Sequence, residues 1–221
     1  MILLPLTYLG PIQLYARYFV NDSIVLEQND TYQKQTYRNR ADIYGANGKL
    51  SLIIPVKHCS GTRYKVKDIE IDYATDWRRL HWKGIVSAYN SSPFFEYYQD
   101  IFEPYYKMEF RFLIDLNLKL NDEVLKILSC SLMPKLSQEF IPINKSYGNT
   151  VISNNIFISK DLRDTIHPKS LLKNDDEFNV IKYTQVFEQK HGFIPNLSIL
   201  DLIFNLGPES SEYLGKCMKD K

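Results

Sequence analysis

The stretch of residues 76–98, DWRRLHWKGIVSAYNSSPFFEYY, constrains the fold more than any other part of the chain. It contains both tryptophans, and its apolar side chains recur at helical spacing. Trp82, Ile85 and Tyr89 fall on one face of a helix, which predicts that this helix packs against a core. The following Asn-Ser-Ser-Pro break ends the helix, because proline favours the first position of a new one.

The start of the same predicted helix is rich in cations. Arg78, Arg79, His81 and Lys83 lie within six residues, with Asp76 as the neighbouring acid. Such a helix start can offer hydrogen-bond donors to a phosphate or a carboxylate. The alternative is structural, because arginines commonly line the rim of an aromatic core and a single histidine commonly serves as a hydrogen-bond donor. Both interpretations stay open.

The composition limits what kind of protein this is. The 221 residues are 44% hydrophobic and 14% aromatic, which is enough to bury a full core. The 27 basic and 26 acidic residues nearly cancel, so the protein as a whole has no electrostatic field that would attract nucleic acid. Any anion-binding site must be local. We expect a single domain over residues 1–221, made of a sheet-forming part (1–75), a helical part (76–130) and a C-terminal α/β part (131–221).

The sequence also indicates a compartment. Its three cysteines are odd in number and widely spaced, which fits a reducing cytosol better than a disulfide framework or a zinc site. The apolar N-terminus lacks a basic region and a cleavage pattern, and no later segment is long enough to span a membrane. We therefore expect a cytoplasmic protein without a membrane span.

The N-terminal residues predict a βαβ unit. Residues 1–4 and 23–26 are short apolar runs typical of buried strands, and residues 12–19 between them have one apolar helical face. We expect the two strands to be parallel and joined by a right-handed crossover. Ligands of such sheets bind at the carboxyl ends of the strands, which here are the loop 5–10 and the segment after Leu26.

The segment after the second predicted strand, residues 27–40, is polar throughout apart from tyrosine rings. One interpretation is a solvated surface loop. The other, favoured by its place at a strand end, is a loop that folds over a substrate. In that case Glu27 or Asp30 could act on a hydroxyl group or a metal, while phosphate or carboxylate oxygens are held by Lys34, Arg38 and Arg40.

The remaining patterns predict further elements. Short strands are expected at 41–44, 50–56, 66–71, 140–141, 151–152 and 181–187, the first two forming a hairpin around a Gly/Asn turn. Helices are expected at 94–106, at 110–130 with an interruption near Asn121, and at 199–205 behind a cap at Ser198 or Asn196. Residues 161–167 are expected to form a surface loop or a lid. The predicted fold class is α/β, with a Rossmann-like βαβ N-terminal half and a mixed sheet, a helical middle segment, and a C-terminal strand and helix that return to the sheet.

Several ordered motifs resemble those of one family. They are Tyr8-Leu9, the Asn39-Arg40 pair, Ile54-Pro55-Val56-Lys57, the DWRR and HWK groups of residues 76–83, Tyr89 with the Pro-Phe-Phe that follows it, and Gly192 with Ile194-Pro195-Asn196-Leu197-Ser198 and Asp201. Across most of its length the chain is similar to the WbqC-like proteins of bacterial surface-polysaccharide gene clusters. That family often has a His-Gln-Pro element where this chain has Leu4-Pro5-Leu6. Any catalytic role of that histidine therefore cannot be assigned to this chain. The resemblance implies a cytoplasmic role in making or decorating sugar precursors of an O-antigen or a similar glycan.

Two functions remain open. One is a transferase acting on a nucleotide-activated or amino sugar, with a nucleotide sugar or another anionic small molecule as its partner. Its acid/base candidates are His81, Asp30, Glu27 and His58. Its substrate-binding candidates come from the cationic helix, the polar segment and the family motifs: Tyr8, Lys34, Arg38, Asn39, Arg40, Lys57, Trp77, Arg78, Arg79, Lys83, Tyr89, His191, Asn196 and Ser198.

The other function is a non-catalytic protein of the same pathway that binds a sugar or a partner through its aromatic residues. The chain has no glycine-rich phosphate loop and no metal-ligand spacing. We therefore predict no metal site and assign no cofactor.

Overall fold

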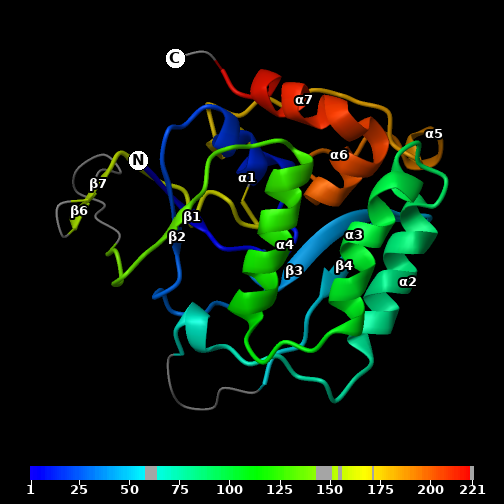
Figure 1. Cartoon of the computed structure of the whole chain (residues 1–221). Coiled ribbons are helices and arrows are strands. Elements are labelled where there is room, and N and C mark those ends of the chain that lie inside the picture. The colour runs from blue at the N-terminus through cyan, green and yellow to red at the C-terminus, as the bar shows by residue number, and fades with distance from the viewer. Residues whose placement is uncertain (58–63, 143–150, 154–155, 171, 220–221) are drawn as a thin grey trace.

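The N-terminal unit forms the centre of a parallel sheet. The structure is a computed structural model that describes residues 1–57, 64–142, 151–153, 156–170 and 172–219. Strands β1 (Ile2–Pro5) and β2 (Ile24–Glu27) pair in parallel, with Ile2 opposite Ile24. The short strands β5 (Lys135–Leu136) and β8 (Lys160–Asp161) extend the sheet on either side in the order β5-β2-β1-β8 (Figure 1).

The connection between the two central strands is helical, as predicted. Helix α1 (Ile12–Ala16) continues directly into the 3-10 helix η1 (Arg17–Phe19), and every residue of α1 is buried. The central strands are buried on both faces, which explains why they read as continuous apolar runs rather than alternating ones. The α/β class and the parallel β1–β2 pair are thus confirmed.

The predicted hairpin is present but stands apart from the parallel strands. Strands β3 (Arg40–Gly45) and β4 (Gly48–Ile53) are antiparallel and form a separate two-stranded sheet. The chain turns in two residues, and Gly48 adopts a φ of +96°, which a residue with a Cβ rarely tolerates. The larger sheet is therefore entirely parallel rather than mixed.

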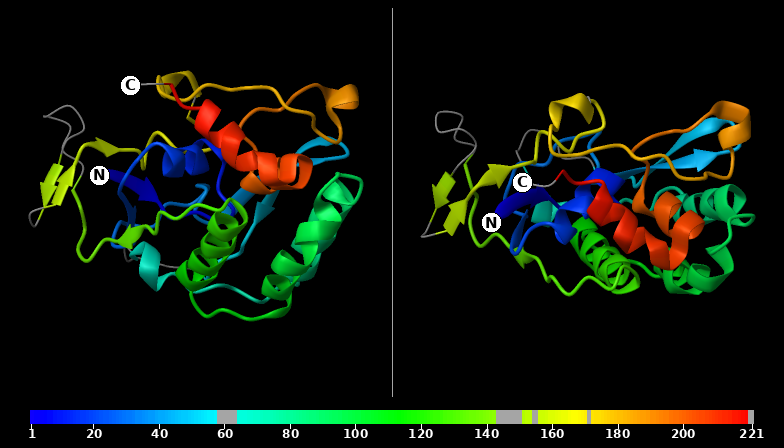
Figure 2. Two further views of the ribbon diagram at one scale, coloured as in Figure 1. Left: turned by 45° about the horizontal axis from the view of Figure 1, so that its top comes forward. Right: turned by 90° about the horizontal axis from the view of Figure 1, so that it is seen from above.

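Three helices make up the middle of the chain. The tryptophan-rich stretch forms α2 (Trp77–Tyr89), followed by α3 (Phe95–Lys107) and α4 (Leu113–Ile127). Helices α2 and α3 lie side by side in all views (Figures 1 and 2). The interruption predicted near Asn121 is wrong: α4 is continuous there because Asn121 is buried in the helix rather than exposed in a break.

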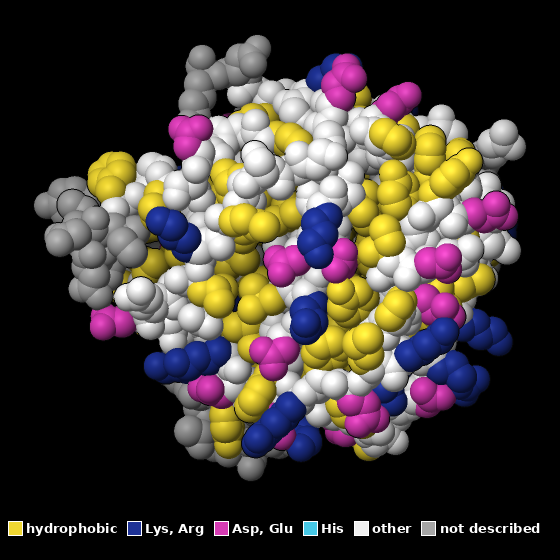
Figure 3. Space-filling view, in the orientation of Figure 1, with side chains coloured by type: hydrophobic (Ala, Val, Ile, Leu, Met, Phe, Trp, Pro, Cys, Tyr) yellow, Lys and Arg dark blue, Asp and Glu magenta, His cyan; other side chains and the backbone are white. Residues whose placement is uncertain are grey.

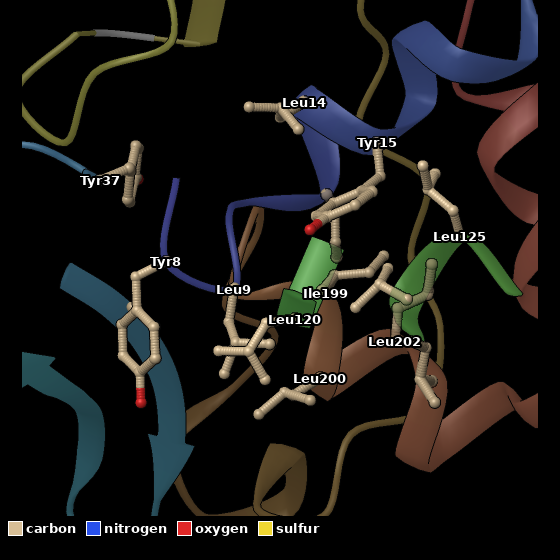
Figure 4. Close-up of a cluster of buried hydrophobic side chains, with 14 of the residues drawn as sticks. Tyr8, Leu9, Leu14, Tyr15, Tyr37, Leu120, Leu125, Ile199, Leu200 and Leu202 are labelled. Atoms are coloured by element: carbon tan, nitrogen blue, oxygen red, sulfur yellow. The ribbon is translucent and has the colours of Figure 1, made fainter. Parts of the chain in front are cut away.

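The C-terminal part places a buried helix in the centre of the core. It contains α5 (Glu188–His191), α6 (Ile199–Leu206), the 3-10 helix η4 (Gly207–Glu209) and α7 (Ser210–Lys216). Residues 199–205 are all buried, and the Phe204 ring contacts those of Tyr89, Phe95 and Phe102. Figure 4 shows Ile199 and Leu202 of α6 in one cluster with Leu120 and Leu125 of α4. One hydrophobic core thus joins both ends of the described chain.

Some short predicted strands are wrong. Residues 66–68 form the 3-10 helix η2 (Val66–Asp68), while residues 140–141 and 181–187 belong to no strand. The segment 181–187 is held by side chains instead, since the Tyr213 hydroxyl donates to the Ile181 carbonyl and Gln185 bonds the backbone of Ile194. Strand β6 (Val151–Ser153) pairs with β7 (Ile156–Ile158) as a hairpin, and the remaining short helix is η3 (Leu172–Asn174).

The surface is mixed in character. Figure 3 shows charged side chains of both signs interspersed with hydrophobic ones over one face, as the near-zero net charge predicts. Within the described residues, no helix combines the length and the apolar character that a bilayer crossing requires.

Gly207 is the glycine on which the α6–α7 corner depends. It has a φ of +53°, and a Cβ there would lie 2.5 Å from Cδ1 of Phe94. Gly207→Ala should lower the free energy of unfolding by about 1–3 kcal/mol, because both the backbone and the contact are strained. Urea denaturation measures this change.

Gly215→Ala is the matched control for that substitution. A Cβ at Gly215, inside α7, meets no atom within 4 Å, so alanine should raise stability by about 0.5–1 kcal/mol through helix propensity. Equal effects at the two positions would contradict the proposed role of Gly207.

Candidate functional site

Polar side chains gather where the parallel strands end. Because all four strands run in the same direction, their carboxyl ends meet at one edge of the sheet. The group that we call the strand-end cluster consists of Glu27, Asn29, Asp30, Arg38, Ser137, Asp161 and Arg163. It brings three predicted residues, Glu27, Asp30 and Arg38, together with residues that follow β5 and β8.

Glu27 is the buried anchor of the cluster. One carboxylate oxygen accepts from the Ser137 hydroxyl at 2.6 Å and from the Asn29 amide at 2.7 Å. The other accepts from the Ile141 amide at 3.0 Å and faces Nη1 of Arg163 at 3.5 Å. Four donors match the lone-pair positions of a carboxylate. Glu27 therefore joins the end of β2 to the chain beyond β5 and β8.

Arg163 is the cation that balances this anchor. Its guanidinium is buried, donates to both oxygens of Asp161 and reaches the Ile141 carbonyl at 2.8 Å. Burial by itself would lower the pKa of Arg163, but the hydrogen bonds and charge of Asp161, with the charges of Asp30 and Glu27, raise it. Arg163 is accordingly a fully engaged structural cation.

Arg38 differs from Arg163 because part of its donor capacity is unused. Its side chain is only 4% exposed and its Nη2 donates to Asp30 at 2.9 Å, yet its Nε has no hydrogen-bond partner among the described residues. Burial lowers the pKa of Arg38, and the charge of Asp30 partly restores it. Asp30 itself is 14% exposed, so the Asp30–Arg38 pair forms the accessible side of the cluster.

A histidine lies beside this pair. Burial lowers the pKa of His167, and the cations Lys169 and Arg38 lower it further. Its Nδ1 accepts from the Lys169 amide at 3.0 Å. The ring is only partly buried, so His167 is a partly accessible imidazole within electrostatic reach of Arg38.

His81, a predicted acid/base residue, lies in the core instead. Its Nδ1 contacts the Tyr8 hydroxyl at 3.1 Å, which in turn lies 2.8 Å from the Tyr106 hydroxyl. The Trp77 ring packs edge-on against the imidazole, with the ring centroids 5.1 Å apart. Burial lowers the pKa of His81 to about 4, with a small opposing effect from a hydrogen bond to the backbone of Ile53. The imidazole is therefore neutral at physiological pH.

The cations of α2 do not converge on a common point. Arg78 donates to the Met108 carbonyl at 2.8 Å and to Glu109, while Arg79 pairs with Asp76 at 2.6 Å. Lys83 is exposed. Arg78 and Arg79 are thus paired separately, and the structure brings none of these side chains to the strand-end cluster.

Tyr89 belongs to a second buried network, around Asp201 of α6. The carboxylate accepts from the Tyr89 hydroxyl at 2.9 Å, from Gln185 Nε2 at 2.9 Å and from the Tyr183 hydroxyl. None of the ion pairs found in the described residues includes Asp201. Burial raises its pKa to about 6, although the three neutral donors pull it down.

The other predicted substrate-binding residues are dispersed. Arg40 pairs with Asp42 at the hairpin, the Asn39 amide donates to the Ile54 carbonyl, Lys57 pairs with Glu70, and Lys34 is exposed. The ring of His191 bonds the Ala46 carbonyl, Asn196 accepts from the Gln13 amide, and Ser198 caps α6. His58 lies outside the described residues.

Sequence reasoning missed Ser137, Asp161, Arg163 and His167. The strands that position them are two residues long, so neither alternation nor an apolar run marks them. The available signal was the Asp-Leu-Arg-Asp sequence at residues 161–164, two residues after the apolar triplet at 156–158, which places charges near a strand end. Across the described part of the chain, no three His, Cys, Asp or Glu side chains are grouped so as to hold a metal ion.

The fold and this edge define an α/β protein with a polar site at the ends of parallel strands. The chain belongs to the WbqC-like protein family, whose model matches residues 7–213. It is 25% identical over 209 residues to the Uncharacterized protein Rv1507c of Mycobacterium tuberculosis, with 89% of each chain covered. No solved structure matches the chain significantly.

The buried imidazole should make stability fall in mild acid. Because the pKa of His81 is about 4 when folded and about 6.5 when unfolded, the contribution is complete above pH 6.5 and is lost as the pH falls toward 4. The loss amounts to about 3 kcal/mol of unfolding free energy. The test compares variants: in urea denaturation between pH 7 and pH 4, His81→Gln should lose about 3 kcal/mol less stability than the unaltered protein, and the exposed-site control His191→Gln should follow the unaltered protein.

Asp201 should act in the opposite direction. Its pKa is about 6 when folded and about 3.8 when unfolded, so protonation relieves the buried charge and stability rises by about 3 kcal/mol as the pH falls from 6 to 4. Asp201→Asn should therefore lose stability in acid more steeply than the unaltered protein does. Asp22→Asn, at an exposed site, is the control, and identical slopes for both variants would exclude a raised pKa at Asp201.

Proposed function

We propose that this protein is a transferase of surface-polysaccharide precursor synthesis that binds a nucleotide-activated or amino sugar at the strand-end cluster. The observation that supports it is the unpartnered Nε of Arg38, a buried guanidinium at the carboxyl ends of parallel strands. A buried donor without a partner is unfavourable, and an oxygen of a bound phosphate would satisfy it. Family membership supports the pathway.

The Asp30–Arg38 pair supplies the two groups that such a reaction needs. Arg38 would hold the anionic group of the donor, because guanidinium presents several N–H groups in one plane. Asp30, beside it and partly exposed, would accept the proton of an attacking hydroxyl or amine. Glu27 and Arg163 would position both residues without contacting substrate. We further propose that the chain acts as one domain in the cytoplasm, where nucleotide sugars are made.

A second candidate is a non-catalytic binding protein of the same pathway. It is favoured by the state of the other predicted acid/base residues: Glu27 already accepts from four donors, and His81 is enclosed by Tyr8 and Trp77. In this case the same cluster would bind an anionic sugar and release it unchanged.

Arg38→Lys tests the binding site. Titration calorimetry against UDP- and GDP-sugars should show affinity that falls roughly tenfold to a hundredfold in Arg38→Lys, since a charged hydrogen bond contributes about 1.5–3 kcal/mol. Arg79→Lys, which alters an exposed pair, should bind like the unaltered protein. A nucleotide sugar that binds both variants equally would contradict the proposed site.

Asp30→Asn separates the two candidate functions. In a transferase this variant should bind the donor but consume it at least tenfold more slowly, as followed by phosphorus NMR. Unfolding curves for each variant show whether a loss reflects the site or the fold. Binding without consumption in the unaltered protein, across sugar and amine acceptors, would favour the binding protein.

A further inference from the structure

A surface hollow lies between the α2–α3 turn and the segment that leads into α5. Its volume is about 680 Å³, and its lining combines Pro93 and Val186 with the polar residues Ser91, Ser92, Thr184, Gln185, Glu188, Gln189 and Asn205. It shares no residue with the strand-end cluster. The volume is large enough for a small polar molecule such as a monosaccharide.

The charge around this hollow has one sign. Its lining includes Glu188 and no lysine, arginine or histidine. The Asp201 carboxylate lies behind the hollow. Its hydrogen-bond donors within the described structure are all neutral. Burial, and after it the charges of Asp201 and Glu188, raise the pKa of Tyr44, so both acids lie within electrostatic reach of the Tyr44 hydroxyl. The charged groups that line or back the hollow are therefore both acidic.

Two lining residues bond to Asp201, one to its carboxylate and one to its backbone. Gln185, which is buried, donates from Nε2 to Asp201 at 2.9 Å, and Asn205 donates from Nδ2 to the Asp201 carbonyl at 2.7 Å. The amide oxygen of Asn205 keeps an acceptor position that the described residues do not fill. Asn205 also lies in the last turn of α6, where the helix dipole favours a cation.

We propose that this hollow binds a small polar molecule through a protonated primary amine, the chemistry of an amino sugar. Carboxylate, carbonyl and hydroxyl oxygens would accept from the ammonium group, whose three N–H donors need three acceptors. An anion would face two carboxylates, and a neutral sugar would gain nothing from them. The inference does not depend on the proposed transferase, because neither Arg38 nor Asp30 takes part.

Titration calorimetry at pH 7 with glucosamine, N-acetylglucosamine and glucose tests the ligand class. The three probes share a ring, but glucosamine alone carries an amine that can be protonated. Glucosamine should bind at least tenfold more tightly than the other two, and binding should weaken as salt is added. Equal affinities for the three sugars, or no binding of glucosamine, would overturn the proposal.

Two variants locate the site. Thr184→Lys adds a cation at an exposed lining position and should abolish glucosamine binding without unfolding the protein. Glu188→Gln should weaken binding about threefold to fivefold, whereas Glu212→Gln on α7 should leave it unchanged. Binding that survives Thr184→Lys would place the amine elsewhere.

Discussion

The buried contact between Glu27 and Arg163 is the interaction on which the sheet edge depends. β5 and β8 each contribute only two residues, so backbone pairing alone cannot fix where the chain goes beyond them. Glu27 accepts hydrogen bonds from Ser137 and Ile141, which lie after β5, and contacts Arg163, which lies after β8. Removing one partner would leave the other as an uncompensated buried charge, which costs far more than an exposed pair contributes.

The sequence predicts the local elements well and the contacts between distant ones poorly. The apolar runs of β1 and β2, the Gly/Asn turn of the hairpin and the helical stripe around Trp82 are signals that lie within a few residues. By contrast, the two-residue strands β5 and β8 exist because β1 and β2 offer free edges, and no local pattern encodes that. Asn121 likewise suggested a break in the helix. In the structure it is buried within a continuous α4, and the residues that pack around it come from elsewhere in the chain.

The same distinction explains the candidate site. Glu27, Asp30 and Arg38 lie together at the strand ends, because the parallel topology fixes that edge of the sheet. The run of cations along α2 suggested a shared anion site, but neighbouring residues on a helix point in different directions. Arg78 and Arg79 instead pair with two different acidic residues. Arg163 lies 136 residues from Glu27, a separation at which sequence pattern carries no information about contact.

The order of strands in the sheet has a consequence for synthesis of the protein. The central pair β1–β2 is made first, but its two outer edges are covered only by residues 135–136 and 160–161. While the ribosome elongates the chain between these points, an apolar two-stranded ribbon with open edges is exposed, and such edges recruit other strands. The nascent chain therefore passes through an aggregation-prone interval of more than a hundred residues, during which a chaperone that shields the first 27 residues would have its largest effect.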